Sequence, residues 1–228
     1  MSYRYFLGDI GSRSQTDLPF LAEPGLRVGP NLSPGEVVTG VFSHMHQTMQ
    51  SSLFRWGLIS TWERGNPHGQ KPLTSLEIES VRERGKWSDA YKRRRLVLPA
   101  HGYVVWSPED DRSRPYRLMQ PKAQLFGIAA VWEAWKPGRG PVVHTCAMLT
   151  RQAAPRFQPI AKRVPVMLPP QLWSSYLWGY LAAPDQVIEA SRHLAVLDVV
   201  ELSDDQFSKD VSDRAALRSS RESVLVAA

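Results

Sequence analysis

The stretch RRRLVLPAHGYVVW, residues 93–106, decides the fold class of this chain. It holds two short runs, Arg95–Leu98 and Tyr103–Trp106, in which leucine, valine and aromatic residues dominate. Valine and aromatic residues favour strands. Between the runs stands Pro99-Ala100-His101-Gly102, and proline together with glycine is typical of a turn. We therefore predict two consecutive strands around this turn.

The same alternation of apolar runs and turns continues on both sides of that stretch. Before it, Val37–Phe42 follows the turn residues Pro34-Gly35. After it, further strands are predicted at Tyr116–Met119, Gln124–Trp135 and Val142–Thr150, separated by Pro121-Lys122 and by Pro137-Gly138-Arg139-Gly140. Many short strands at this spacing predict a curled, mostly antiparallel sheet or an open barrel.

Helical periodicity appears in only a few places. A segment that begins at Pro169 and ends at Gly179 repeats apolar residues at helical spacing. A second helix is predicted from Pro184, and a short one over Ser88–Lys92. The expected fold class is α+β with a few short helices. Because nothing in the chain has the composition of a linker, we expect a single domain over residues 1–228.

Composition bears on the compartment and the partners of the protein. The 228 residues include 28 lysines and arginines against 22 acidic residues, a net charge of +6. A basic balance favours polyanionic partners, because phosphate contacts release counterions. The single cysteine, Cys146, excludes an intramolecular disulfide and fits a reducing compartment. We find no pattern of a signal peptide or membrane span, so we expect a soluble, cytoplasmic protein without a membrane partner.

The sequence predicts neither a cofactor nor a metal. It has no phosphate-cradling glycine loop, no dinucleotide fingerprint and no serine-hydrolase elbow. His44 and His46 would share one face of a strand, but no further ligand stands at a matching interval, so a zinc site is not expected. Cys146 lies in the apolar run VVHTCAML and is interpreted as a small buried residue rather than a nucleophile.

Several segments, taken in order, resemble the SRAP domain family, also called SOS-response-associated peptidases. They are RVGPNLSPGEVV (27–38), FRWGLISTW (54–62), RRRLVLPAHGYVVW (93–106), QLFGIAAVWEAW (124–135) and KRVPVMLPPQLW (162–173). Val211-Ser212 matches the closing Val-Ser of the family. The ordered set covers nearly the whole chain. The resemblance implies an SRAP-like fold and a role in recognising abasic sites in single-stranded DNA.

The resemblance also implies a particular chemistry. In the family, removal of the initiator methionine leaves a cysteine as the first residue. Its amine and thiol condense with the aldehyde of an abasic site and close a thiazolidine ring, and an asparagine, a glutamate and a histidine assist. The same cysteine is thought to process the protein itself, hence the word peptidase. Such a reaction needs a nucleophile and groups that move protons.

This copy departs from the family at each of those positions. Ser2 stands in place of the cysteine, Ser75 of the asparagine, Val105 of the glutamate and Ala161 of the histidine. Glu77 replaces an arginine that contacts DNA in the family. A hydroxyl traps an imine far less well than a thiolate does, because its pKa is much higher. We therefore expect the crosslinking and peptidase site to be degenerate.

Three residues keep the family's DNA-contacting types: Arg4, Trp62 and Arg163. Trp62 is either a base-stacking residue of the single-strand groove or a core aromatic. Arg4 and Arg163 either bind phosphate, as the resemblance implies, or pair with carboxylates inside the fold. The basic run 92–95 is interpreted as a solvated face in preference to part of a groove.

These observations favour non-covalent binding of single-stranded or abasic DNA by a degenerate family member. A second hypothesis is an enzyme with altered chemistry, in which the amine of Ser2 forms an imine and acts as an abasic-site lyase or transient crosslinker. In that case His101, at the turn near Val105, is the candidate substitute for the missing proton donor. A third is a protein-interaction module that has lost DNA binding. The resemblance itself predicts that residues 2, 75, 105 and 161 converge in space.

Overall fold

The computed structural model describes most of the chain between Tyr3 and Leu202. The described residues are 3–8, 18–21, 26–44, 48–61, 73–83, 85–107, 114–137, 140–192, 194 and 197–202. Val211-Ser212, Trp62, Ser2 and His46 lie outside them.

Five strands close into a barrel. They are β3 (Val37–His44), β4 (Thr48–Trp56), β6 (Arg95–Ala100), β9 (Phe126–Trp135) and β10 (Val143–Gln152). β4 pairs with β3, β3 with β6, β6 with β9, β9 with β10, and β10 with β4, so the circuit of pairings is complete. All of these pairings are antiparallel except that between β10 and β4. The prediction of a barrel from the strand spacing is therefore confirmed. The barrel was expected to be open, whereas its circuit of strand pairings is closed.

Three short strands extend the barrel. β5 (Ser75–Glu77) pairs in parallel with β10, and β11 (Arg163–Pro165) pairs with it in antiparallel. β12 (Met167–Leu168) pairs with β9. Because β10 carries β5 and β11 as well as two barrel strands, it is the strand on which segments distant in sequence meet.

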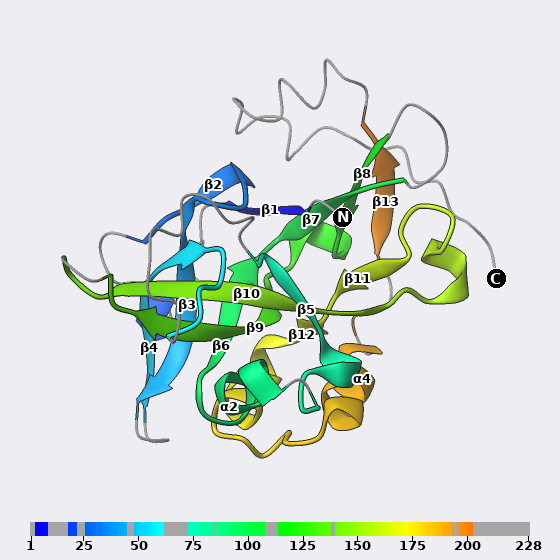
Figure 1. The fold of residues 1–228 in the computed structure, drawn as a ribbon. Coiled ribbons are helices and arrows are strands. Elements are labelled where there is room, and N and C mark those ends of the chain that lie inside the picture. Colours follow the sequence, from blue (N-terminus) through cyan, green and yellow to red (C-terminus); the bar gives the residue numbers. More distant parts are fainter. Residues whose placement is uncertain are drawn as a thin grey trace.

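A second sheet, which we call the flanking sheet, lies beside the barrel in the upper part of Figure 1. Its strand order is β13-β8-β7-β1-β2, and every pairing is antiparallel. The strands are β1 (Arg4–Leu7), β2 (Gly29–Leu32), β7 (Gly102–Trp106), β8 (Pro115–Met119) and β13 (Asp198–Glu201). Gly102 is required here, because a Cβ at this position would overlap the ring of Phe6 and the backbone oxygen of Leu118.

Three short helices lie at the lower side of the molecule in Figure 1. They are α2 (Gly85–Arg93), α3 (Trp173–Leu177) and α4 (Pro184–Arg192). Short 3-10 turns occur elsewhere along the described chain as well, namely η1 (Pro19–Leu21), η3 (Ile78–Ser80), η4 (Pro121–Ala123), η5 (Pro155–Phe157) and η6 (Pro170–Leu172). Gly179 has a left-handed φ of 86° just after α3, which is a common way for a helix to end. No helix in the described part of the chain is long and apolar enough to cross a membrane.

The core lies inside the barrel and between it and the flanking sheet. The rings of Tyr5 on β1 and Trp56 on β4 lie 5.4 Å apart and are fully buried. Cys146 is also fully buried, as predicted, and burial raises the pKa of its thiol. The thiolate form that reacts is therefore suppressed.

The basic run 92–95 is not a solvated face throughout, and that interpretation is wrong for two of its residues. Lys92 and Arg93 are exposed, but Arg94 bonds to the buried carboxylate of Glu133 at 2.8 Å. Arg95 is 6% exposed, because its guanidinium is surrounded by backbone oxygens of the helices and the loop after α3. Half of the run therefore belongs to the framework that joins α2 and α3 to the barrel.

Candidate nucleic-acid interface

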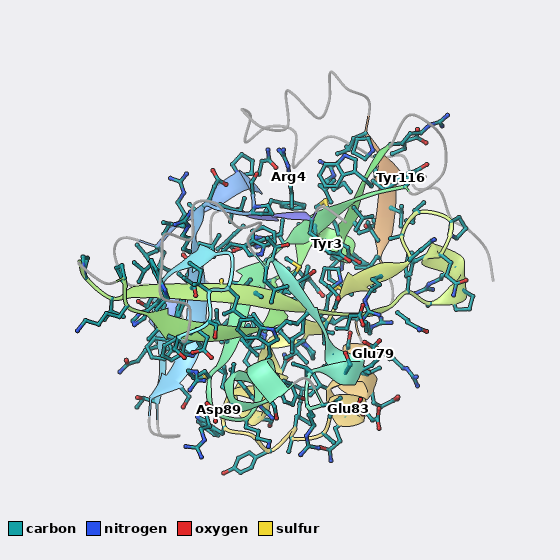
Figure 2. All side chains as sticks on the ribbon, in the orientation of Figure 1. Tyr3, Arg4, Glu79, Glu83, Asp89 and Tyr116 are labelled. Atoms are coloured by element: carbon teal, nitrogen blue, oxygen red, sulfur yellow. The ribbon has the colours of Figure 1, made fainter. Side chains whose placement is uncertain are left out.

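The first strand places the start of the described chain against β11. Tyr3 is 2% exposed, and its hydroxyl donates a hydrogen bond to the backbone oxygen of Arg163 at 3.2 Å. Burial raises the pKa of Tyr3 to about 12, so the hydroxyl keeps its proton. Arg4 projects from the opposite side of β1, as strand alternation requires (Figure 2). Its guanidinium lies 5.8 Å from the centre of the Trp106 ring.

Val105 lies on β7, next to this first strand. Arg4 is paired with Val104 and Tyr5 with Tyr103, so the register continues toward Val105 at the start of β1. Val105 is 2% exposed. An apolar side chain at this position neither accepts nor donates a proton, and its burial shows that the surrounding core has closed on it.

Ser75 comes from β5, on the far side of β10 from β11. It is paired with Met148, and Glu77 is paired with Thr150 two residues further along β10. On the other edge of β10, Arg163 is paired with Gln152. Side chains two residues apart on a strand share a face. Ser75, Glu77 and Arg163 therefore project from the same face of three neighbouring strands.

The guanidinium of Arg163 is occupied by neighbours on this face. Its Nε donates to the Thr150 hydroxyl at 3.1 Å, and its Nη2 donates to the Thr150 backbone oxygen at 2.7 Å and to the Glu79 carboxylate at 2.5 Å. The other oxygen of Glu79 accepts the backbone N–H of Gln152 at 2.9 Å. Of the alternatives left open for Arg163, the structure therefore shows the carboxylate pair.

Glu79 is held in its charged form by these contacts. Partial burial raises the pKa of its carboxyl, but the hydrogen bonds from Arg163 and from the Gln152 N–H outweigh burial and leave the pKa below its usual value. Glu79 was not among the residues predicted for the site. It stands 84 positions from Arg163 in the sequence, and no local sequence pattern predicts the contact between them.

Ala161 lies between η5 and β11, two residues before Arg163. Its backbone N–H donates to the oxygen of Phe157 at 2.8 Å, and the residue is 4% exposed. The methyl group offers no proton-transfer function. As at Val105, a buried apolar side chain occupies the position.

Contacts link most of the predicted site, but Ser2 and Trp62 lie outside the described residues. Val105 lies on the strand beside β1, Tyr3 immediately before β1 bonds to Arg163, and Arg163 and Ser75 flank the same segment of β10. The convergence of positions 2, 75, 105 and 161 stays a prediction.

The structure does not bring His101 together with Val105. The backbone N–H of His101 bonds to Phe6, toward the end of β1, and its Nδ1 accepts the N–H of Gly8 at 3.1 Å. Four residues of extended chain separate it from Val105, about 13 Å. Burial lowers the pKa of His101, which keeps the ring neutral at pH 7.

A further residue near this face, Arg151, was also missed by the sequence analysis. It is 8% exposed, its Nε donates to the Ser191 hydroxyl at 3.2 Å, and its Nη1 donates to the backbone oxygen of Gln152 at 3.1 Å. Burial lowers its pKa, and no carboxylate of the described chain forms an ion pair with it. Within the described residues, no group of three His, Cys, Asp or Glu side chains could hold a metal ion.

Comparison with known proteins decides the family. The model of the family described as SOS response associated peptidase (SRAP) matches residues 12–212. The chain belongs to the SRAP family. Its relatives include the abasic site processing protein YoqW of Bacillus subtilis, 25% identical over 150 residues that make up 65% of this chain and 66% of the relative. A second, YoaM of the same organism, is 24% identical over 60% of each chain.

Solved structures confirm the SRAP-like fold. A protein from Bacteroides thetaiotaomicron superposes with a TM-score of 0.69 at 16% identity, covering 83% of this chain and 84% of that one. A protein from Bordetella bronchiseptica superposes with a TM-score of 0.68 at 17% identity, covering 89% of this chain and all of that one. At such identities the likeness concerns the fold alone.

Proposed function

We propose that this SRAP protein binds single-stranded DNA, abasic or otherwise damaged, without linking itself to it covalently. The support for DNA as the partner is membership of the SRAP family together with relatives named as abasic site processing proteins. The net charge of +6 agrees with a polyanionic partner.

The observation that carries the non-covalent part of the proposal is the burial of Val105. If the family's acid stands at this position, as the resemblance implies, the acid has been replaced by a valine that is 2% exposed. Ala161, at the position of the family's histidine, is 4% exposed. General acid–base assistance is typically worth about 10²–10⁴-fold in rate. Two such groups are lost, and Ser2 stands in place of the cysteine. Closure of a stable ring therefore lacks both the thiol that would attack the imine and the groups that would transfer protons.

The proposed contacts are Arg4, Trp62 and Arg163. Arg163 binds a phosphate by exchanging its Glu79 partner for it. If the two arginines then each neutralise one phosphate, the salt slope for a single strand is about −1.4, so affinity should fall about sevenfold between roughly 50 and 200 mM salt. Replacing Arg4 with glutamine should weaken binding and flatten the slope by about 0.7. Arg93→Gln is the matched control, since Arg93 is exposed on α2 at the other side of the molecule.

Fluorescence anisotropy with a labelled 20-nucleotide strand, intact, abasic or duplex, measures these effects. We expect single strands to bind better than duplex. Equal loss of affinity in Arg4→Gln and Arg93→Gln would show that binding is diffuse and does not use the proposed face. Absence of binding at every salt concentration would contradict the proposal and would favour the hypothesis of a protein-interaction module.

A denaturing gel tests the chemistry. Incubated with abasic single-stranded DNA and heated, the protein should give no crosslinked band. Borohydride reduces any imine that an accessible amine forms with the aldehyde, so a trapped band is compatible with simple binding. A trapped adduct that maps to residue 2, accompanied by strand cleavage, would instead support the lyase. Ser2→Cys should not restore full crosslinking, because Val105 and Ala161 stay unchanged, and full rescue would refute our account of degeneracy.

A further inference from the structure

A cleft of about 700 Å³ lies at the His101 end of the β1–β7 pair, away from Val105. Its walls come from the turn between β6 and β7, the connection from β8 to β9, and the connection from β12 into α3. This volume is within the usual range for small-molecule sites, about 300–1,000 Å³. Arg4 and Arg163, the described residues proposed above to contact DNA, do not line it.

The hydrogen-bonding groups of the cleft are neutral and partly fixed in direction. Three glutamines (Gln120, Gln124 and Gln171), Ser174 and His101 line it, and none of the described lining residues is charged. Because Nδ1 of His101 accepts the Gly8 N–H at 3.1 Å, its Nε2 carries the hydrogen of the neutral ring. The side-chain amide of Gln120 donates a hydrogen bond to the backbone oxygen of Leu194 at 2.9 Å. The side-chain carbonyl oxygen of Gln120 is the acceptor that it can offer to a ligand.

The turn at the rim of the cleft is strained. Lys122 and Ala123 have φ values of 61° and 49°, both in the left-handed region, although neither is a glycine. Each costs about 1–2 kcal/mol relative to a right-handed conformation. Ala123 lines the cleft, and Lys122 beside it is exposed. Strain of this kind persists where the surroundings demand it and is concentrated at ligand sites.

We propose that this cleft binds a neutral nucleobase. Carboxamides supply the paired donor and acceptor that match the edge of a base, most directly adenine. Pro169, Pro170 and Leu125 supply apolar walls for its faces. The described lining residues offer no positive charge to a phosphate or carboxylate inside the cleft, and Lys122 stands exposed at its rim. Only the source of the base, a DNA strand, rests on the proposed function.

Saturation-transfer NMR with deoxyadenosine tests the cleft directly. From its 18 heavy atoms we expect a Kd of the order of 0.1–1 mM. The H2 and H8 protons of the base should be saturated, whereas 2-deoxyribose alone should give no signal. The nucleoside carries no phosphate, so this result does not depend on whether the protein binds DNA strands, and loss of strand binding leaves it standing.

Two single variants link the signal to the cleft. Gln124→Leu and Gln171→Leu each remove one carboxamide from an exposed position, and each should weaken deoxyadenosine binding about 2–12-fold, the equivalent of one neutral hydrogen bond. Gln158→Leu, an exposed glutamine after η5, is the matched control and should bind like the unmodified protein. Absence of saturation, or equal affinity in all four proteins, would overturn the proposal. Saturation of a diproline peptide in place of the nucleoside would overturn it in favour of a protein ligand.

Discussion

Replacement of Arg95 by methionine tests whether the basic run is structural. The guanidinium donates from Nε to the oxygen of Tyr91 at 2.8 Å, and from Nη1 to the oxygens of Tyr176 at 2.9 Å and Leu181 at 2.8 Å. A longer contact of 3.4 Å reaches Ala182. These oxygens belong to the ends of α2 and α3 and to the loop after α3, where helices leave carbonyls without partners.

The expected loss can be worked out from these contacts. A hydrogen bond to a charged group contributes about 1.5–3 kcal/mol, but losses at one side chain are not additive, and methionine keeps part of the packing against the Tyr91 and Tyr176 rings. Arg95→Met should therefore reduce the free energy of unfolding by about 3–5 kcal/mol. At about 2–4 °C per kcal/mol for a chain of this size, the melting temperature should fall by roughly 6–20 °C.

Urea and thermal unfolding, followed by circular dichroism, measure this loss. Arg93→Met is the control from the same run: its side chain is 78% exposed and makes an ion pair with Asp89 at 3.1 Å. That change should cost about 0.5 kcal/mol or less. If Arg95→Met does not fold, Arg95→Lys keeps the charge with fewer donors and should fall between the two. Equal stability of the Arg93 and Arg95 variants would refute the reasoning.

Three further outcomes follow from the site and the core. Glu79→Gln should strengthen single-strand binding about 1.5–5-fold, since it removes a negative charge and the ion-pair partner of Arg163, and unchanged anisotropy would contradict that role. Because the folded pKa of Glu79 is lowered, the stability from this pair is present above the ordinary carboxyl pKa of about 4.3 and is lost as the pH falls through the folded value. Urea titrations should therefore show the unmodified protein losing more stability than Glu79→Gln between about pH 5 and pH 3, and parallel curves would argue against the linkage. Cys146 should resist a thiol-disulfide dye at pH 8 in the folded protein and react in urea, and rapid labelling before unfolding would show that the core opens there.

Local sequence predicted four of the five barrel strands and the helices because their signals are local, but it did not predict β4 (Thr48–Trp56). Gln124–Trp135 and Tyr103–Trp106 lie within one or two residues of β9 and β7, since apolar runs bounded by proline and glycine carry their own boundaries. Ser75–Glu77 was not predicted as a strand. It has one apolar residue in three, and its pairing with β10, about 70 residues away, decides its conformation.

The candidate site rests on the resemblance, which could not predict its contacts. Ser75, Val105 and Arg163 were identified from motifs, whereas the Glu79 carboxylate that meets Arg163 could not be, because the two are brought together only by β10. Arg93 and Arg95 look alike in sequence. Arg95 differs in that it bonds to backbone oxygens more than 80 residues further along the chain. The residues near Arg95 in the sequence do not predict these contacts.

The many pairings of β10 also fix the order in which the molecule can be completed during synthesis. β3 and β4 can pair as soon as both are made, but the free edge of β4 waits for Thr145 and Cys146. β1 can pair with β2 and then with β7, but the hydrogen bond from Tyr3, just before β1, waits for Arg163. At about 5–20 residues per second, roughly 10–30 s separate the two ends of that contact. Throughout this interval Tyr3 lacks its partner on β11, so the last contact of the first strand is among the last that the molecule can make.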